Sequence, residues 1–237
     1  MIETSDQIEP VYPAATVVLL RDGTAGMEAL LVQRSQAVKH MGGMWVFPGG
    51  RVDEADYPAD RDEFGAALNA AIRETEEEAG LHIRPEQLVY LSHWTTPSGA
   101  KKRFATWFFL AILDDGQEVR VDGGEIANHR WMCPRLACQE AAGGGESLRM
   151  MPPTYVSLVD IADYANCLQA SAAIGERRAL VYEPQMVFVE DGVCFLYAGD
   201  SGYASEDHEA EGPQHRFYMI DGKLRYVRSE SITVGDD

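Results

Sequence analysis

The sequence lacks the features that mark membrane and secreted proteins. It contains no apolar run near the roughly 20 residues that a bilayer-spanning helix needs. Its first residues, MIETSDQIEP, are acidic and polar, without the basic and apolar regions of a signal peptide. Its four cysteines are scattered and form no CxxC pair, which indicates free thiols rather than disulfides or a zinc site. We therefore expect a cytoplasmic protein.

Basic residues are scarce as well. The chain holds 20 Lys and Arg against 38 Asp and Glu, a formal net charge of −18. A general nucleic-acid binder carries a basic footprint, so this charge excludes that class. A small phosphorylated substrate remains compatible, because local basic clusters and bound cations reverse the field within a cleft. The length of 237 residues fits one globular domain with an addition, or one domain and a small second one.

The strongest pattern in the chain is a predicted helix over 63–79, which Gly80 closes. On this helix Glu74, Glu77 and Glu78 share one face. Glu74 and Glu78 repel each other at a cost of roughly 0.2–0.5 kcal/mol. The three carboxylates also crowd the C-terminal half of the helix, where the macrodipole disfavours negative charge. A divalent cation would offset both costs, so the spacing predicts a site for Mg²⁺, which prefers oxygen ligands.

Short apolar runs on both sides of this helix predict strands. They cover 15–20, 28–34, 45–47, 88–94, 104–113 and 125–131. The acidic segment 51–63 is predicted to be an inserted loop. Pro134 predicts the start of a short helix that ends at the following glycine run, and a long helix is predicted from Tyr155 to about Ala173.

Beyond Val181 the pattern changes to paired apolar runs. Asp-Gly pairs at 191–192 and 221–222 separate runs at 186–189, 193–197, 217–220 and 224–227. Asp-Gly between apolar runs is a strong signal for a β-hairpin. We expect a main domain over residues 1–178, an α+β or α/β sandwich, and a C-terminal antiparallel β-hairpin extension over 179–237.

The segment from Gly50 to Leu81 resembles the Nudix box, G-x5-E-x7-R-E-U-x-E-E-x-G-U, where U is apolar. Residues 73–81, RETEEEAGL, match it with Thr75 at an apolar position, and FPGG at 47–50 is the usual lead-in. The resemblance implies the Nudix hydrolase superfamily, an α+β fold built as an α/β/α sandwich with a mixed sheet. It also implies hydrolysis of a diphosphate linked to a nucleoside.

The box departs from the family pattern between its two halves. Its first acid falls on Asp56 when counted from Gly50, and on Gly65 when counted back from Arg73, so residues have been inserted. The first acid is therefore Asp56, Glu63 or absent. In the family this acid mainly supports the arginine of the box.

A second resemblance narrows the substrate. LLVQRS at 30–35, Lys39, Gly43 and FPGG at 47–50 are similar to the signature of Nudix coenzyme A diphosphatases, LLTxR[SA]x3Rx3Gx3FPGG. Valine replaces threonine and lysine replaces arginine. Because the R…G…W…PGG lead-in is widespread among Nudix enzymes, the LL-x2-RS run and Lys39 carry the added information.

The resemblance implies roles for particular residues. Mg²⁺ or Mn²⁺ is expected at Glu74, Glu77, Glu78 and the carbonyl of Gly50, with Arg73 holding the carboxylates in place. The general base is a box glutamate or a later acid, for which Glu125 is the candidate. Substrate binding is expected at Arg34, Lys39, Lys101, Arg103 and Phe104, although each cation alone is also explained as a surface residue.

Three functions remain open from the sequence. The first is a metal-dependent diphosphatase for coenzyme A or acyl-CoA, giving an adenosine bisphosphate and a phosphopantetheine. The second is a Nudix hydrolase for ADP-ribose, NADH or a nucleoside triphosphate. The third is a Nudix-fold sensor that binds a nucleotide without cleaving it, which the retained glutamates disfavour. In each, the partner is a small molecule rather than a nucleic acid or a membrane. A homodimer is possible, since Nudix proteins often dimerise, but the sequence shows no self-complementary surface.

Overall fold

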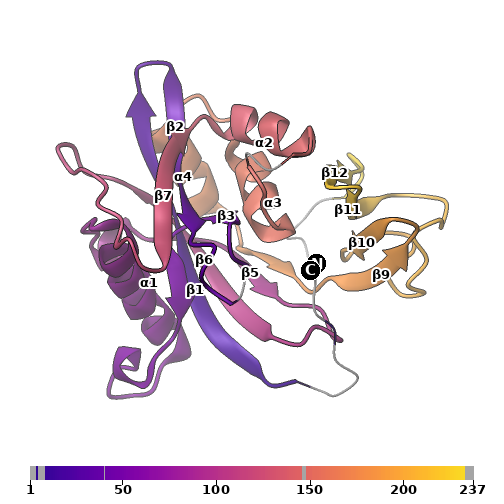
Figure 1. Cartoon of the computed structure of the whole chain (residues 1–237), viewed down its shortest axis with the longest axis horizontal. Helices are drawn as coiled ribbons and strands as arrows, with labels where there is room; N and C mark the ends of the chain where they lie inside the picture. Colours follow the sequence, from indigo (N-terminus) through magenta and orange to yellow (C-terminus); the bar gives the residue numbers. More distant parts are fainter. Residues whose placement is uncertain (1–3, 5–8, 40, 146–147, 233–237) are drawn as a thin grey trace.

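The computed structural model describes residues 4, 9–39, 41–145 and 148–232 and contains a large sheet of eight strands (Figure 1). These strands are β1 (Val11–Gly23), β2 (Gly26–Arg34), β3 (Trp45–Val46), β4 (Gly49–Arg51), β5 (Val89–Thr95), β6 (Arg103–Ile112), β7 (Ile126–Met132) and β8 (Leu180–Tyr182). Their order is β3-β2-β1-β6-β5-β8, with β4 paired to β1 and β7 paired to β2. The sheet is mixed, because β1 and β6 run parallel, as do β5 and β8, while the other pairs are antiparallel.

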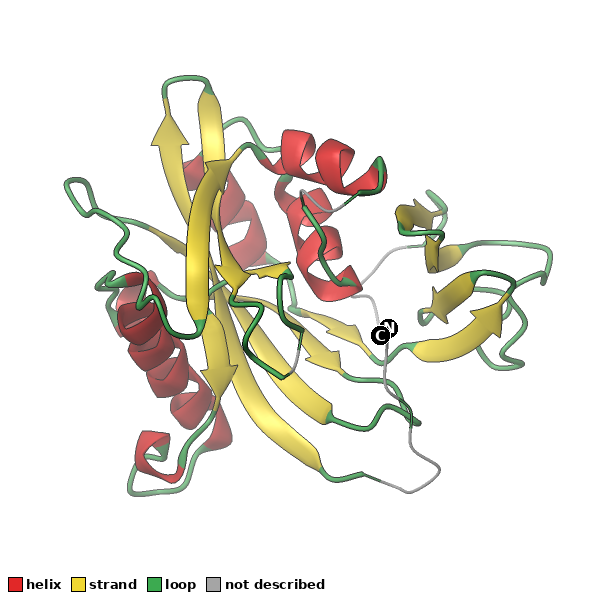
Figure 2. Cartoon of the chain, viewed as in Figure 1, coloured by secondary structure: helices red, strands yellow, loops and turns green. Residues whose placement is uncertain are grey.

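Helices cover both faces of this sheet (Figure 2). The helix α1 (Glu63–Ala79) lies on one face, and α2 (Pro134–Ala142), α3 (Pro152–Ile161) and α4 (Cys167–Glu176) lie on the other. Two short 3-10 turns, η1 (Glu54–Asp56) and η2 (Pro85–Gln87), flank α1. Alternate residues of β1 face opposite sides, so Val17 packs with the alanines of α1 while Val18 packs with α3. This arrangement confirms the α+β fold, an α/β/α sandwich with a mixed sheet. No helix among the described residues is long and apolar enough to cross a membrane.

The prediction of one long helix from Tyr155 to about Ala173 was wrong. The structure has two helices there, α3 and α4, separated by residues 162–166. Asn166 caps α4, because its extended backbone lets the side chain accept a hydrogen bond from the Gln169 N–H. Asp22 of β1 accepts from the Cys167 N–H at 3.1 Å and fixes the start of α4 against the sheet. Asp and Asn favour such caps over helix interiors, so the apolar periodicity alone could not reveal the break.

The C-terminal part forms a second, antiparallel sheet, which confirms the expected hairpin extension. Its strands are β9 (Gln185–Val189), β10 (Gly192–Leu196), β11 (His215–Ile220) and β12 (Lys223–Arg228), in the order β12-β11-β10-β9. Asp221 and Gly222 turn the second hairpin with φ of 48° and 71°, as a type I′ turn requires. Pairing of β10 with β11 joins the two hairpins into one sheet.

The connection between β10 and β11 is organised by a buried ion pair. Arg216 bonds Asp200 through Nε at 2.6 Å and through Nη2 at 2.7 Å, and both side chains are almost fully buried. Asp200 also accepts from the N–H groups of Gly202 and His215. Arg216 also donates to the carbonyls of His208 and Ala210, so the acidic stretch 205–212 of this connection is folded around the arginine.

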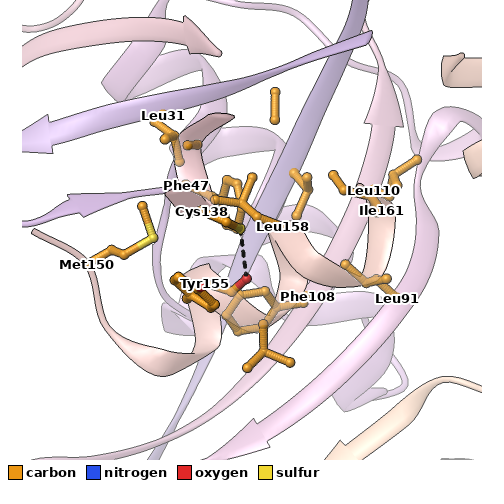
Figure 3. Packing of buried hydrophobic residues seen from close by; sticks show 14 of the residues in the cluster. Leu31, Phe47, Leu91, Phe108, Leu110, Cys138, Met150, Tyr155, Leu158 and Ile161 are labelled. Atoms are coloured by element: carbon orange, nitrogen blue, oxygen red, sulfur yellow. Dashed lines mark hydrogen bonds between the residues drawn. The ribbon is translucent and has the colours of Figure 1, made fainter. Parts of the chain in front are cut away.

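The second sheet packs on the core of the first. One hydrophobic cluster contains Phe108 of β6 and Tyr155 of α3, which are labelled in Figure 3. Phe217 of β11, from the second sheet, belongs to the same cluster. The Tyr155 and Phe217 rings lie 5.2 Å apart. The division at residue 178 stays a proposal, since β8 just beyond it still belongs to the large sheet.

Candidate active site

The helix α1 is held in place by its caps and by a face of small residues. The Asp62 side chain accepts from the Gly65 N–H at 2.7 Å, and Gly80 ends the helix in a left-handed conformation, φ 66°. Alanines 66, 67, 70 and 71 are buried and let the helix approach the sheet closely. Thr75, at an apolar position of the box, is fully buried, and its hydroxyl donates to the Ala71 carbonyl at 2.7 Å. This placement turns Glu74 and Glu78 toward β4.

The glycine strand β4 is aligned by its register with β1. Gly50 lies opposite Ala15, and Gly49 lies opposite Thr16. The N–H of Val17 donates to the Pro48 carbonyl, and the N–H of Val52 donates to the Pro13 carbonyl. Because bonded and non-bonded pairs alternate in an antiparallel ladder, the N–H and carbonyl of Gly50 point at β1 and those of Gly49 point away from it.

The main chain of Gly49 therefore faces the acidic residues of α1. Its N–H donates to Oε2 of Glu78 at 2.9 Å. The approach leaves no room for side chains, because a Cβ on Gly50 would lie 2.4 Å from Oε1 of Glu74. The sequence pointed to Gly50 as the carbonyl ligand; the strand register favours Gly49 instead. The sequence offered no signal for Gly49, because strand pairing sets the direction of each carbonyl.

Glu78 is the most perturbed acid of the cluster. Its side chain is 7% exposed, and burial raises its pKa to about 8, against the opposing effect of the Gly49 hydrogen bond. Burial also raises the pKa of Glu74. Arg73 lowers this pKa in part, and the negative charges of Glu77 and Glu125 raise it further. One buried and one partly buried carboxylate with raised pKa values are groups that a bound cation would stabilise.

Arg73 holds several acids of the site in place, and its contacts identify Asp56 as the residue in the place of the first acid of the Nudix box. Its Nε and Nη2 bond the two oxygens of Asp56 at 3.0 and 2.8 Å. Its Nη1 bonds Glu74 at 2.8 Å and Glu77 at 3.0 Å. Burial alone would raise the pKa of Asp56, but the hydrogen bonds from Arg73 and the Asp53 N–H lower it. Asp56 thus supports the arginine, whereas Glu63 is exposed in the first turn of α1.

Arg34 and Glu125 lie beside the acidic cluster of Glu74 and Glu78, although they come from the end of β2 and from the loop before β7. Arg34, at the end of β2, lies 4.0 Å from Glu78 and 3.6 Å from Glu125. The loop before β7 is shaped by Asp122, whose carboxylate accepts the N–H groups of Gly124, Glu125 and Ile126. Glu125 itself is 66% exposed and raises the pKa values of Glu74 and Glu78.

The remaining box glutamates point outward. Glu77 is 59% exposed and bonded to Arg73, and Glu76 lies 3.6 Å from His82 on the solvent side. Among the described residues, no three acidic, histidine or cysteine side chains already converge as metal ligands would. The oxygens of Glu74, Glu78 and Gly49 fit the donor set of Mg²⁺ or Mn²⁺.

The other expected substrate residues lie further from the acids. Lys39 is exposed in the loop after β2. Arg103 begins β6 opposite Val11 of β1, whereas Arg51 of β4 lies opposite Ala14 of the same strand. Val11 and Ala14 are roughly 10 Å apart along β1. The Nε of Arg103 donates to the Thr96 carbonyl. Phe104 follows on β6, and Lys101 is exposed in the preceding loop. The structure brings Arg34 and Glu125 to the acidic cluster, whereas Lys39 and Lys101 lie in loops and Arg103 and Phe104 lie on β6.

Comparison with known proteins gives a consistent family assignment. The family model described as NUDIX domain matches residues 11–152. A nudix hydrolase of Caenorhabditis elegans is 23% identical and covers 93% of this chain and 80% of its own length. A Xenopus laevis protein named acyl-coenzyme A diphosphatase NUDT19 is 22% identical, over 86% of this chain and 83% of its own. The crystal structure of a NUDIX hydrolase from Alicyclobacillus acidocaldarius superposes with a TM-score of 0.62 and 23% identity, covering 70% of this chain and 97% of that one. The second sheet lies outside the matched domain.

Proposed function

The chain belongs to the Nudix family and is a Nudix hydrolase, and from this premise we propose that it hydrolyses the diphosphate bond of coenzyme A or of an acyl-CoA. The observation that carries the hydrolase chemistry is the convergence of Glu74 and Glu78 on the Gly49–Gly50 strand. The substrate assignment rests on the LL-x2-RS run with Lys39, and is supported by the names of the Xenopus and human acyl-coenzyme A diphosphatases among the relatives.

The reaction is proposed to depend on Mg²⁺ or Mn²⁺. Glu74, Glu78, Glu77 and the carbonyl of Gly49 would hold the ion, which neutralises the diphosphate and lowers the pKa of an attacking water. Arg73 positions Glu74 through the bond at 2.8 Å and is itself fixed by Asp56. The Gly49 N–H holds one oxygen of Glu78 and so orients the carboxylate.

Proton removal from the attacking water is proposed for Glu125. The exposed carboxylate lies near the acidic cluster, and Arg34 lies between it and Glu78. A general base must reach the proton directly or through one water, and a loop acid beside the site meets this need. Lys39, Lys101, Arg103 and Phe104 are proposed to contact the substrate beyond its diphosphate. A homodimer, which the resemblance allows, and a cytoplasmic location, expected from the sequence, stay predictions.

A substrate panel tests this function. The protein is incubated with Mg²⁺ or Mn²⁺ and with CoA, acyl-CoA, ADP-ribose, NADH and nucleoside triphosphates, and the products are analysed by mass. Cleavage of CoA or acyl-CoA to adenosine 3′,5′-bisphosphate at the highest kcat/KM is expected. Preference for another member would refute the substrate, and no cleavage of any member would refute the hydrolase chemistry.

Matched variants on one helix separate the site from the fold. Glu77→Gln is expected to remove most turnover, because the proposed metal loses a charged ligand. Glu76→Gln, one position away and turned to solvent beside His82, is expected to keep it. Circular dichroism should show both variants folded. Near-normal turnover of Glu77→Gln would contradict the metal assignment.

A further inference from the structure

Arg51 lies directly after the two glycines of β4, but its side chain leaves the strand on the other face. The missing Cβ of Gly50 points at Glu74, toward α1. Successive side chains of a strand point to opposite faces, so the Arg51 side chain points away from α1. There its guanidinium lies 4.2 Å from the centre of the Tyr12 ring on β1.

No carboxylate among the described residues pairs with this Arg–Tyr stack. The carboxylates of Asp53 and Asp56, which follow Arg51 in the chain, and that of Glu74 on α1 all pair with Arg73, and Arg51 forms no ion pair among the described residues. In a chain with 38 acidic and 20 basic residues, the partner that the described part of the structure gives this exposed arginine is therefore the aromatic ring of Tyr12.

A similar stack elsewhere shows the contrast. Arg61 lies 4.2 Å over the ring of Tyr57, and this arginine does pair with a carboxylate, that of Glu54. The Arg61 stack is thus explained by local charge pairing, whereas the stack on Arg51 is not. Arg225 also lies 4.2 Å over a ring, that of Tyr218, and forms no ion pair among the described residues, so it is the position of Arg51 in β4, beside the acidic cluster, that sets this stack apart.

Aromatic surface continues beside the stack. Tyr12 is 38% exposed, and Phe104 lies directly opposite it in the parallel register of β1 and β6. The two rings are 6.5 Å apart and tilted by 48°. A tyrosine and a guanidinium that share one face leave a flat, cationic and partly apolar surface open to solvent.

We propose that Arg51 and Tyr12 form the subsite that stacks the nucleobase of the substrate, with Phe104 at its edge. This inference rests on the proposed function, in which the diphosphate is held at Gly49 and the glutamates. Arg51 lies two residues further along the strand, roughly 6.6 Å at the usual rise. A Cβ on Gly50 would meet Glu74 and a Cβ on Gly49 would meet β1, so the bare main chain of β4 separates the two places. Guanidinium planes and aromatic rings stack on nucleobases, with a contribution of about 1–3 kcal/mol per base.

Stacking and simple charge attraction make different demands on Arg51. A lysine keeps the positive charge but loses the plane, and Arg and Lys are not interchangeable at stacked sites. Arg51→Lys is therefore expected to raise KM for the nucleotide substrate by about 5- to 100-fold, while kcat changes less than threefold. Tyr12→Leu should act in the same way, because the guanidinium loses its support. Arg61→Lys is the matched control and should leave both constants unchanged.

Binding of products gives a readout that does not depend on turnover. Adenosine 3′,5′-bisphosphate and ribose 5-phosphate, which lacks the base, are titrated into each protein by calorimetry with Mg²⁺ present. Arg51→Lys and Tyr12→Leu should weaken the first ligand by about the factor seen in KM and leave the second unchanged. Equal affinity of wild type and variants for the nucleotide, or equal weakening of both ligands, would overturn the subsite. If wild type cleaves no substrate of the panel, the proposed function fails, whereas normal turnover with an unchanged KM in Tyr12→Leu sinks only this inference.

Discussion

Replacing Glu78 by glutamine should stabilise the metal-free protein at neutral pH. The Glu78 carboxyl is 7% exposed, and its pKa is raised from 4.5 to about 8, chiefly by burial. Between these two values the folded protein keeps the proton that the unfolded chain has lost. Stability must then fall as pH rises through this window, by about 1.4 kcal/mol per pH unit.

The size of the effect follows from this window. At pH 7 the difference reaches about 3 kcal/mol in favour of the glutamine variant, an upper value because relaxation of the empty site reduces it. For a chain of this length, 1 kcal/mol shifts the melting temperature by roughly 2–4 °C. Glutamine keeps an oxygen that can accept from the Gly49 N–H, so the fold around it is preserved.

The assay is thermal unfolding in EDTA at pH 5, 6, 7 and 8, with Glu76→Gln as the control on the same helix. Glu78→Gln should melt close to wild type at pH 5 and roughly 6–12 °C above it at pH 7. Excess Mg²⁺ should then raise the melting temperature of wild type more than that of the variant, since the ion would need the charged carboxylate. Parallel pH profiles for wild type and Glu78→Gln would refute the reasoning, because they would show that the buried carboxyl carries no raised pKa.

Three further outcomes are expected. Asp56→Asn should lower activity about 10- to 100-fold and weaken Mn²⁺ binding in a titration, because Arg73 loses its charged partner; unchanged Mn²⁺ affinity and rate would contradict the supporting role of Asp56. Glu125→Gln should lower kcat by about 10²- to 10⁴-fold with little change in CoA affinity, and a change of only a few fold would assign the general base to a box glutamate. Arg216→Leu should reduce the free energy of unfolding in urea by about 3–5 kcal/mol, since Asp200 is left buried and unpaired; the double variant with Asp200→Asn should recover part of this loss.

Local features of this protein were readable from its sequence. The helix over 63–79 has the bounds expected, because its apolar spacing, its cap and Gly80 all act within a few residues. The hairpin at Asp221-Gly222 forms for the same reason, since its turn needs left-handed conformations that these residues tolerate. The acidic face of the helix was visible because residues at i, i+3 and i+4 must share one side.

Contacts between residues that are far apart in the sequence were decided only by the tertiary structure. The insertion before α1 removed the spacing that identifies the first acid, and the fold selects Asp56 by bringing it within 2.8 Å of Arg73. The choice between Gly49 and Gly50 depends on pairing with β1, because the direction of a strand carbonyl is set by its neighbour. Likewise α3 and α4 are separate because Asp22, far earlier in the chain, fixes the start of α4.

The sequence alone therefore determined which residues are acidic and on which helix face they lie, since helix periodicity is local. The tertiary structure decided which of them are buried, that the main chain of Gly49 faces them, and that Arg34 and Glu125 join them from two other parts of the chain. Burial raises the pKa of Glu78, and burial is a property of the packed fold rather than of any short segment.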